Sequence, residues 1–168
     1  MVNIFLLTFP RSGSVFFMNA TSLPGLSRTH DPKEIPKDSQ VIGILRKPEE
    51  SIASYLVMLN YLGVSLDIKE LIKSYKLVYK YYLSNNCILI LNEDLRDNPK
   101  EIINKIFEPL EKFNVFNEKS SKKYPTEKYL KSSKTMSSYE QTLKEIKLIN
   151  LSEIKLLYEK AKEKAIKV

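Results

Sequence analysis

Cysteine and glycine are both scarce in this 168-residue chain. Cys87 is the sole cysteine, so no internal disulfide can form. It lies in an apolar run, which favours a small buried side chain over a reactive thiol. The four glycines all lie at or before Gly63, so a glycine-rich phosphate-binding loop is expected only in the N-terminal part of the chain.

A long hydrophobic run is also missing. No apolar stretch approaches the roughly 18 residues that a membrane-spanning helix needs, so we expect no membrane span. The apolar N-terminal segment has no basic leader and carries Arg11 where a signal peptide would stay apolar. A cytoplasmic location is therefore the expectation.

The composition and charge fit one soluble domain covering residues 1–168, with 43% hydrophobic and 28% charged residues. The net charge of +7 comes mostly from residues 99–168, which hold 16 basic and 10 acidic side chains. Six lysines lie between residues 119 and 134 alone. Such a run is either a solvated loop or a lid that attracts an anion.

Apolar runs with strand character alternate with stretches of helical periodicity. The pattern predicts strands at 2–8, 41–45 and 87–91. It predicts helices at 15–22, at 48–61 and from 67 to about 82. A further helix begins near Pro99 and is kinked or broken by Pro109, and two more helices close the chain. The expected fold is a three-layer α/β domain of P-loop-like type, with a central parallel sheet flanked by helices. We divide it into a core of about 1–113, a basic loop at 117–138 and C-terminal helices at 139–168.

The turn after the first strand has the properties of an anion site. Thr8 to Ser14 reads Thr-Phe-Pro-Arg-Ser-Gly-Ser and leads into a helix, for which Ser14 is the expected cap. Helix N-termini offer free N–H groups and a positive dipole end to an anion. Gly13 permits close approach of the backbone, and Arg11 adds a permanent charge. An ordinary strand-to-helix turn can look similar.

Arg46 ends the second predicted strand, and Ser54 follows two helical turns later. A residue at the carboxyl end of a parallel strand faces the crevice in which such sheets bind ligands. The alternative is a surface arginine and an ordinary helical serine.

His30 is the only histidine and lies between these two candidate anion sites. A lone histidine is more often structural than catalytic. Histidine is nevertheless the usual side chain for proton abstraction near neutral pH, so His30 is a candidate general base.

Taken together and in order, these segments resemble the sulfotransferase family that uses 3′-phosphoadenosine 5′-phosphosulfate (PAPS). Residues 9–14 resemble the 5′-phosphosulfate loop, and 41–54 resemble the 3′-phosphate motif, in which a serine follows a strand-ending arginine at plus eight. Thr29-His30 resembles the pair that supplies the catalytic base, and 91–99 resembles the downstream Tyr-Glu-Asp-Leu segment.

The resemblance implies a role for each motif in sulfuryl transfer to a hydroxyl or amine of a small-molecule or glycan acceptor, without a metal. His30 would take the acceptor proton, and Arg11 would stabilise the leaving phosphate. The remaining cofactor-binding positions implied are Ser12, Gly13, Ser14, Val15, Phe16, Arg46 and Ser54. Lys131 and Lys134 are expected to serve as a basic lid over the 3′-phosphate.

The chain also departs from the family pattern. Val15 replaces a hydroxyl residue, Phe16 stands where tryptophan is common, and Asn92 replaces an aromatic residue. The glycine-rich C-terminal motif that clamps the 3′-phosphate is missing.

Two other functions remain open. One is a nucleotide or small-metabolite kinase, against which stands the missing Lys-Ser pair of a Walker A loop. The other is a non-catalytic nucleotide- or nucleic-acid-binding protein, favoured by the lysine-rich tail. No nucleic-acid motif or aromatic–basic interleaving supports a nucleic-acid partner.

Overall fold

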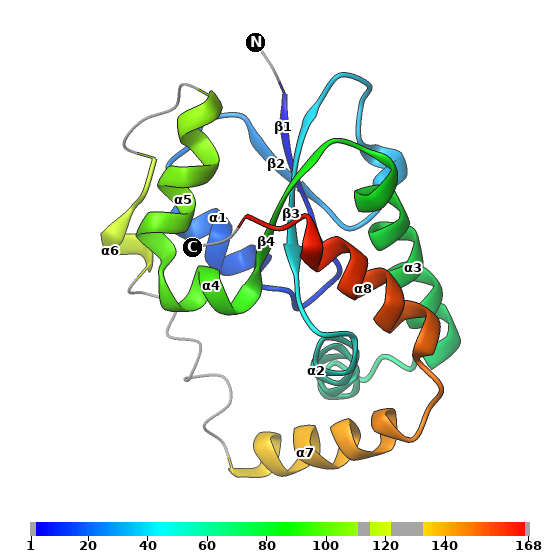
Figure 1. Ribbon diagram of the computed structural model, residues 1–168. Coiled ribbons are helices and arrows are strands. Elements are labelled where there is room, and N and C mark those ends of the chain that lie inside the picture. The colour runs from blue at the N-terminus through cyan, green and yellow to red at the C-terminus, as the bar shows by residue number, and fades with distance from the viewer. Residues whose placement is uncertain (1–2, 111–114, 122–132, 167–168) are drawn as a thin grey trace.

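A computed structural model describes residues 3–110, 115–121 and 133–166 and shows an α/β fold with helices on both faces of a central sheet (Figure 1). The sheet contains four strands: β1 (Ile4–Leu7), β2 (Leu26–Thr29), β3 (Gln40–Leu45) and β4 (Cys87–Leu91). Their order is β2-β1-β3-β4, and every pairing is parallel. The expected α/β class with a parallel sheet is confirmed.

The helices divide between the two faces of the sheet. One face packs against α1 (Ser14–Ala20), α4 (Asn92–Asp97) and α5 (Pro99–Phe107). The other packs against α2 (Pro48–Tyr61), α3 (Ile68–Ser84) and α8 (Ser152–Glu163), and α7 (Ser133–Lys147) packs against α2. Short helices complete the described part: η1 (Pro32–Glu34), η2 (Glu108–Leu110) and α6 (Glu118–Ser121).

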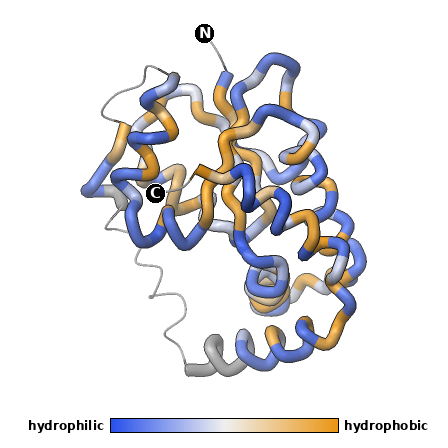
Figure 2. The backbone as a smooth tube through the Cα atoms, viewed as in Figure 1, coloured by the Kyte–Doolittle hydropathy of each residue, from blue (hydrophilic) through white to orange (hydrophobic). Residues whose placement is uncertain are grey.

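Strand β3 contributes to both hydrophobic cores because successive side chains point to opposite faces. Val41 and Leu45 join the cluster beneath α3 and α8, whereas Ile42 and Ile44 join the cluster beneath α1 and α5. Strands β1, β3 and β4 are accordingly hydrophobic over most of their length, while the surface helices alternate (Figure 2). This near-continuous apolarity is typical of a parallel sheet covered on both faces.

Helix α3 stabilises the carboxyl ends of the strands through three buried tyrosines. Tyr75 and Tyr79 donate hydroxyl hydrogen bonds of 2.9 and 3.2 Å to the Arg46 carbonyl, and Tyr82 donates one of 2.5 Å to the Leu7 carbonyl. The Tyr82 ring packs directly onto Gly43 of β3, where a Cβ would lie 2.6 Å from the ring. Burial raises the pKa of all three hydroxyls, which keeps them protonated as donors.

The connections make a topological switch point between β1 and β3. From β1 the chain passes through α1 to β2 on one side, and from β3 it passes through α2 and α3 to β4 on the other. The connecting helices lie on opposite faces of the sheet. Ligands of open α/β sheets bind at the carboxyl ends of strands at such a point.

Several local expectations were wrong. Strand β2 and helix α4 lie in segments to which the sequence pattern assigned no strand or helix, and Gly13 rather than Ser14 occupies the N-cap of α1. Helix α7 begins at Ser133, inside the segment expected to be a basic loop, and α6 also lies within that segment. These segments carry few apolar residues, so their periodicity gave no signal.

Within the described ranges, no helix has both the length and the apolarity needed to cross a membrane.

Candidate functional site

The loop from Thr8 to Gly13 leaves the carboxyl end of β1 and is anchored by buried side chains. Thr8, Phe9 and Ser12 are fully buried, whereas Arg11 between them is exposed. The Phe9 ring packs 5.1 Å from Tyr75, and the Ser12 N–H donates to the Phe9 carbonyl at 3.3 Å. Arg11 has a φ of +66°, a left-handed conformation that costs energy in a residue with a Cβ. The loop is therefore tightly built.

Gly13 joins this loop to helix α1. Its φ of +99° and ψ of 9° are left-handed, and Ser14 directly after it is helical. When a residue in the left-handed backbone conformation is followed by one in the right-handed helical conformation, their N–H groups point toward the same side. They then form a concave nest that suits an anion. The N–H groups of the first helical turn have no intrahelical acceptor and lie beside it. Gly13, Ser14, Val15 and Phe16 thus present main-chain donors beside the loop.

Asn92, the first residue of α4, packs directly against the loop. Its Nδ2 donates a hydrogen bond of 3.0 Å to the Ser12 carbonyl. A Cβ on Gly13 would lie 2.5 Å from the same Nδ2 atom, so the asparagine requires a glycine there. The sequence identified Asn92 only as a departure from the family pattern, and its contact across 80 residues could not be read from spacing.

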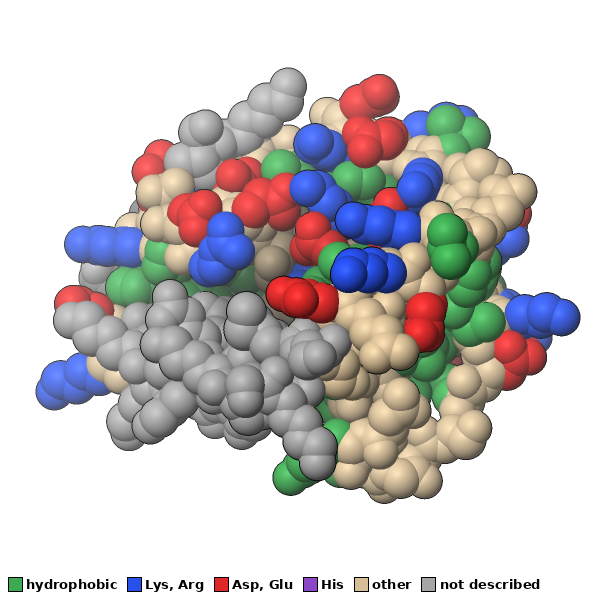
Figure 3. All heavy atoms as spheres, turned by 90° about the horizontal axis from the view of Figure 1, so that it is seen from below, with side chains coloured by type: hydrophobic (Ala, Val, Ile, Leu, Met, Phe, Trp, Pro, Cys, Tyr) green, Lys and Arg blue, Asp and Glu red, His purple; other side chains and the backbone are tan. Residues whose placement is uncertain are grey.

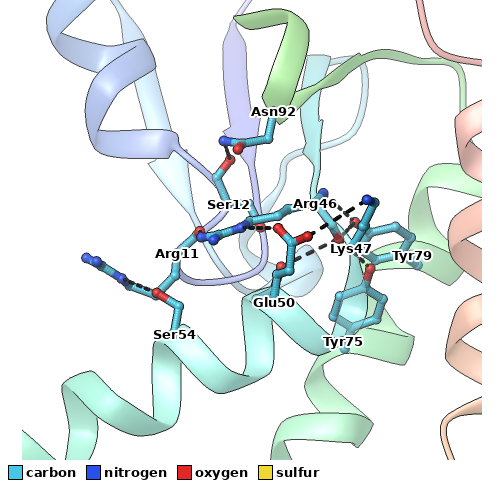
Figure 4. Close-up of polar contacts among 10 residues, drawn as sticks. Arg11, Ser12, Arg46, Lys47, Glu50, Ser54, Tyr75, Tyr79 and Asn92 are labelled. Atoms are coloured by element: carbon cyan, nitrogen blue, oxygen red, sulfur yellow. Dashed lines mark hydrogen bonds and ion pairs between the residues drawn. The ribbon is translucent and has the colours of Figure 1, made fainter. Parts of the chain in front are cut away.

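Arg46 also reaches the loop, from the end of β3. Its Nη1 donates a hydrogen bond of 2.8 Å to the Arg11 carbonyl, and its Nε lies 3.5 Å from a carboxylate oxygen of Glu50 (Figure 4). The Lys47 ammonium lies 3.9 Å from the other oxygen of Glu50. Burial raises the pKa of the Tyr139 hydroxyl on α7, and the positive charge of Arg46 partly opposes the rise. The arginine expected at the 3′-phosphate thus lies beside the loop, with an acidic neighbour that the sequence reading missed.

Ser54 lies two turns into α2 and faces the same loop. Its hydroxyl accepts a hydrogen bond of 3.3 Å from Nε of Arg11 (Figure 4). Arg11, in the first predicted phosphate motif, therefore contacts both ends of the second motif, through its carbonyl with Arg46 and through its side chain with Ser54. The two motifs form one continuous cluster at the switch point.

His30 follows β2 and is held at the start of the same loop. Its Nδ1 lies 2.6 Å from the Thr8 carbonyl and 3.3 Å from the Thr8 hydroxyl. Because a carbonyl only accepts, Nδ1 carries the proton, and in the neutral ring Nε2 is left unprotonated. The imidazole is exposed, so Nε2 is available to accept a proton. The two nearby carboxylates are engaged: Glu34 accepts from the Thr29 hydroxyl, and Asp31 caps η1.

The hydroxyl of Ser12 is buried without a hydrogen-bond partner among the described residues. Leaving a buried hydroxyl unpaired costs about 1–3 kcal/mol, so it is a rare feature that suits a binding loop. Ser14 beside it is also buried. Together with the nest at Gly13, this unpaired hydroxyl fits a phosphate or sulfate group.

Two surface depressions are lined by residues other than those of this cluster. One of about 530 Å³ lies over residues 97–104, and one of about 280 Å³ lies between η1 and the second half of α3. Neither is lined by Arg11, Ser12 or Arg46. The candidate site is thus defined by converging polar groups on the described surface and not by either depression.

The expected basic lid cannot be placed. Lys131 lies outside the described residues, and of Lys134 only its position in α7 is described. Viewed from below, toward the carboxyl ends of the strands, the described side chains show lysine and arginine interspersed with acidic residues (Figure 3). Anion binding on this face must therefore come from specific groups and not from a broad positive field.

The cluster combines a main-chain anion nest, two arginines and an imidazole with a free nitrogen. It can bind an anionic group and accept a proton beside it, as group transfer from a phosphate or sulfate donor requires. No group of three or more acidic, histidine or cysteine side chains suited to a metal occurs among the described residues.

In comparisons with models of protein families and with curated proteins, the chain matched none.

Proposed function

We propose that this chain is a sulfotransferase that uses PAPS as donor and a hydroxyl or amine as acceptor. One observation carries the proposal: the loops after β1, β2 and β3 converge through three hydrogen bonds. These join Arg46 to the Arg11 carbonyl, Arg11 to the Ser54 hydroxyl and His30 to the Thr8 carbonyl. The three motifs of the resemblance are therefore neighbours in space, which their spacing along the chain does not require.

The proposed roles follow from these positions. The N–H groups of residues 13–16 and the hydroxyls of Ser12 and Ser14 bind the 5′-phosphate end of the donor. Arg46 and Ser54 are near enough to the loop to bind a second phosphate of the same nucleotide. Arg11, whose guanidinium already lies against Ser54 at the surface, stabilises the charge on the leaving phosphate.

The bound donor supplies an activated sulfuryl group whose leaving group is a phosphate. The chain positions the acceptor oxygen or nitrogen and removes its proton. Nε2 of His30 accepts that proton, and the bond from Nδ1 to the Thr8 carbonyl holds the ring orientation as the positive charge forms. Such positioning by a main-chain acceptor is common for catalytic histidines.

Transfer of ³⁵S from labelled PAPS to a panel of hydroxyl and amine acceptors tests the proposal. We expect label on at least one acceptor class with the wild-type chain, and a loss of about 10²-fold or more with Arg11→Ala. Lys33→Ala, an exposed cation on η1, is the matched control and should behave as wild type. Binding of adenosine 3′,5′-bisphosphate without transfer to any acceptor would instead support a non-catalytic binder.

A further inference from the structure

The strand register places Arg46 and Asn92 side by side. Leu45 of β3 pairs with Leu91 of β4, and each of these residues immediately precedes one of the two polar side chains. Both side chains then reach across to β1's loop, where they bind consecutive carbonyls: Arg46 binds that of Arg11 and Asn92 that of Ser12. Two neighbouring strand ends thus hold two successive peptide units of the loop.

The Asn92 contact fixes the direction of a main-chain donor. In a trans peptide the N–H points opposite to the C=O of the same unit, and no cis bond occurs among the described residues. With the Ser12 carbonyl held toward Asn92, the Gly13 N–H points away from it. This N–H belongs to the nest formed by left-handed Gly13 and helical Ser14.

The neighbours of Asn92 keep it in place. Leu95, one turn later, is buried in the core beneath α1 and α5, which fixes the first turn of α4. The close approach of Nδ2 to Gly13 leaves no room for a side chain at position 13. The asparagine and the glycine are therefore complementary in shape as well as in hydrogen bonding.

We infer that Asn92 is a positioning residue: it holds the Ser12–Gly13 peptide so that the Gly13 N–H faces the bound anion. The identity of that anion as the 5′-phosphate end of a nucleotide rests on the proposed function, whereas the orientation of the peptide does not. Asn92 touches the loop and not the reacting atoms, so its effect on binding passes through Gly13.

Glycine-selective ¹⁵N labelling gives a direct test because the chain has only four glycines. The Gly13 signal is identified by its coupling to a ¹³C-carbonyl-labelled serine, because Ser12-Gly13 is the one Ser-Gly pair in the sequence. Inorganic phosphate and adenosine 3′,5′-bisphosphate are titrated into wild type, Asn92→Ala, Asn92→Asp and the control Asn104→Ala, an exposed asparagine on α5. The other glycine signals show that each variant is folded, and Asn92→Asp preserves side-chain shape if the alanine variant does not fold.

We expect both ligands to shift the Gly13 signal in wild type and Asn104→Ala. In the Asn92 variants we expect the shift to be lost and the dissociation constant to rise about tenfold, as for loss of one hydrogen bond. Wild-type affinity in both Asn92 variants would overturn the inference. If the binding of phosphate depends on Asn92 but adenosine 3′,5′-bisphosphate binds no more tightly than phosphate, the proposed function fails and the inference about Asn92 stands. A Gly13 signal that no ligand moves in wild type would overturn both.

Discussion

At the residue scale, His30 shows how the surroundings of a single side chain fix its orientation and tautomer. The sequence identified it because it is the only histidine and lies between two anion motifs. The structure adds the hydrogen bond from Nδ1 to the Thr8 carbonyl, which leaves Nε2 as the acceptor. That bond spans 22 residues, so the sequence alone could not specify the tautomer.

Replacement of His30 by alanine should lower the rate of sulfuryl transfer by about 10²- to 10⁴-fold, because the general base is lost. Donor affinity should change little, since His30 contacts Thr8 and not the Gly13 nest. Steady-state kinetics and calorimetric binding of adenosine 3′,5′-bisphosphate measure the two effects separately. A wild-type rate of sulfuryl transfer in His30→Ala would mean that His30 has a structural role only.

Glu50 is the residue at the candidate site that opposes anion binding. Its carboxylate contacts both Arg46 and Lys47, so a phosphate placed there would be repelled by it. Glu50→Gln should therefore raise affinity for adenosine 3′,5′-bisphosphate about two- to fivefold, the range expected for a solvent-screened charge.

The matched control for this prediction is Glu70→Gln, at an exposed position in the first turn of α3. Calorimetry at low and at physiological salt measures the effect, which should shrink as salt rises. An unchanged or weaker affinity in Glu50→Gln would mean that the anion does not bind beside Arg46.

At the element scale, the strong apolar segments were predictable and the weak ones were not. Strands β3 and β4 and helix α2 lie where the sequence placed them. Strand β2 was missed because its four residues, Leu-Ser-Arg-Thr, form an edge strand with one large apolar side chain. Periodicity also could not predict the order of the strands in the sheet, because that order depends on which strands pair with one another.

The tyrosines of α3 give the element-scale prediction. Tyr82→Phe should lower the free energy of unfolding by about 1–2 kcal/mol, because the buried Leu7 carbonyl loses a donor. Tyr75→Phe should cost less, since the Arg46 carbonyl also accepts from Tyr79. Urea unfolding measures both against Tyr61→Phe, whose side chain is 88% exposed. Equal stability of Tyr82→Phe and Tyr61→Phe would contradict this role of α3.

At the scale of the whole molecule, the C-terminal segment closes the far edge of the sheet. The Ile166 N–H donates a 2.8 Å hydrogen bond to the Leu89 carbonyl of β4, and Lys164 donates to the Leu83 carbonyl. Ion pairs link α8 to α2 and α3 through Lys155 with Glu49 and Lys76 with Glu153. The last helix therefore belongs to the same cooperative core as β4.

Cys87, at the start of β4, reports on the opening of this edge. Burial raises the pKa of its thiol from 9.0 to about 11, although the Lys164 charge partly opposes the change. The thiol therefore stabilises the fold fully below pH 9, and this contribution is lost as pH rises through about 11. At pH 8 the native thiolate is about 100-fold scarcer than in the unfolded chain.

Alkylation of Cys87 by iodoacetamide at pH 8 should accordingly be about 100-fold slower in the native protein than in urea, with Cys87→Ser as the blank. Mass spectrometry follows the modification over time. Similar rates in the two states would show that this edge of the sheet is open in solution.

In the proposed function, two phosphate subsites are joined at one switch point of the sheet. Its most direct test compares the thermal stabilisation of the protein by adenosine 3′,5′-bisphosphate, AMP and ATP at equal concentrations, in wild type and Arg46→Ala. Ligands that bind the native state raise the melting temperature according to affinity. We expect the bisphosphate to stabilise wild type most and Arg46→Ala to remove its advantage over AMP. Equal shifts by AMP and the bisphosphate in wild type would contradict the claim.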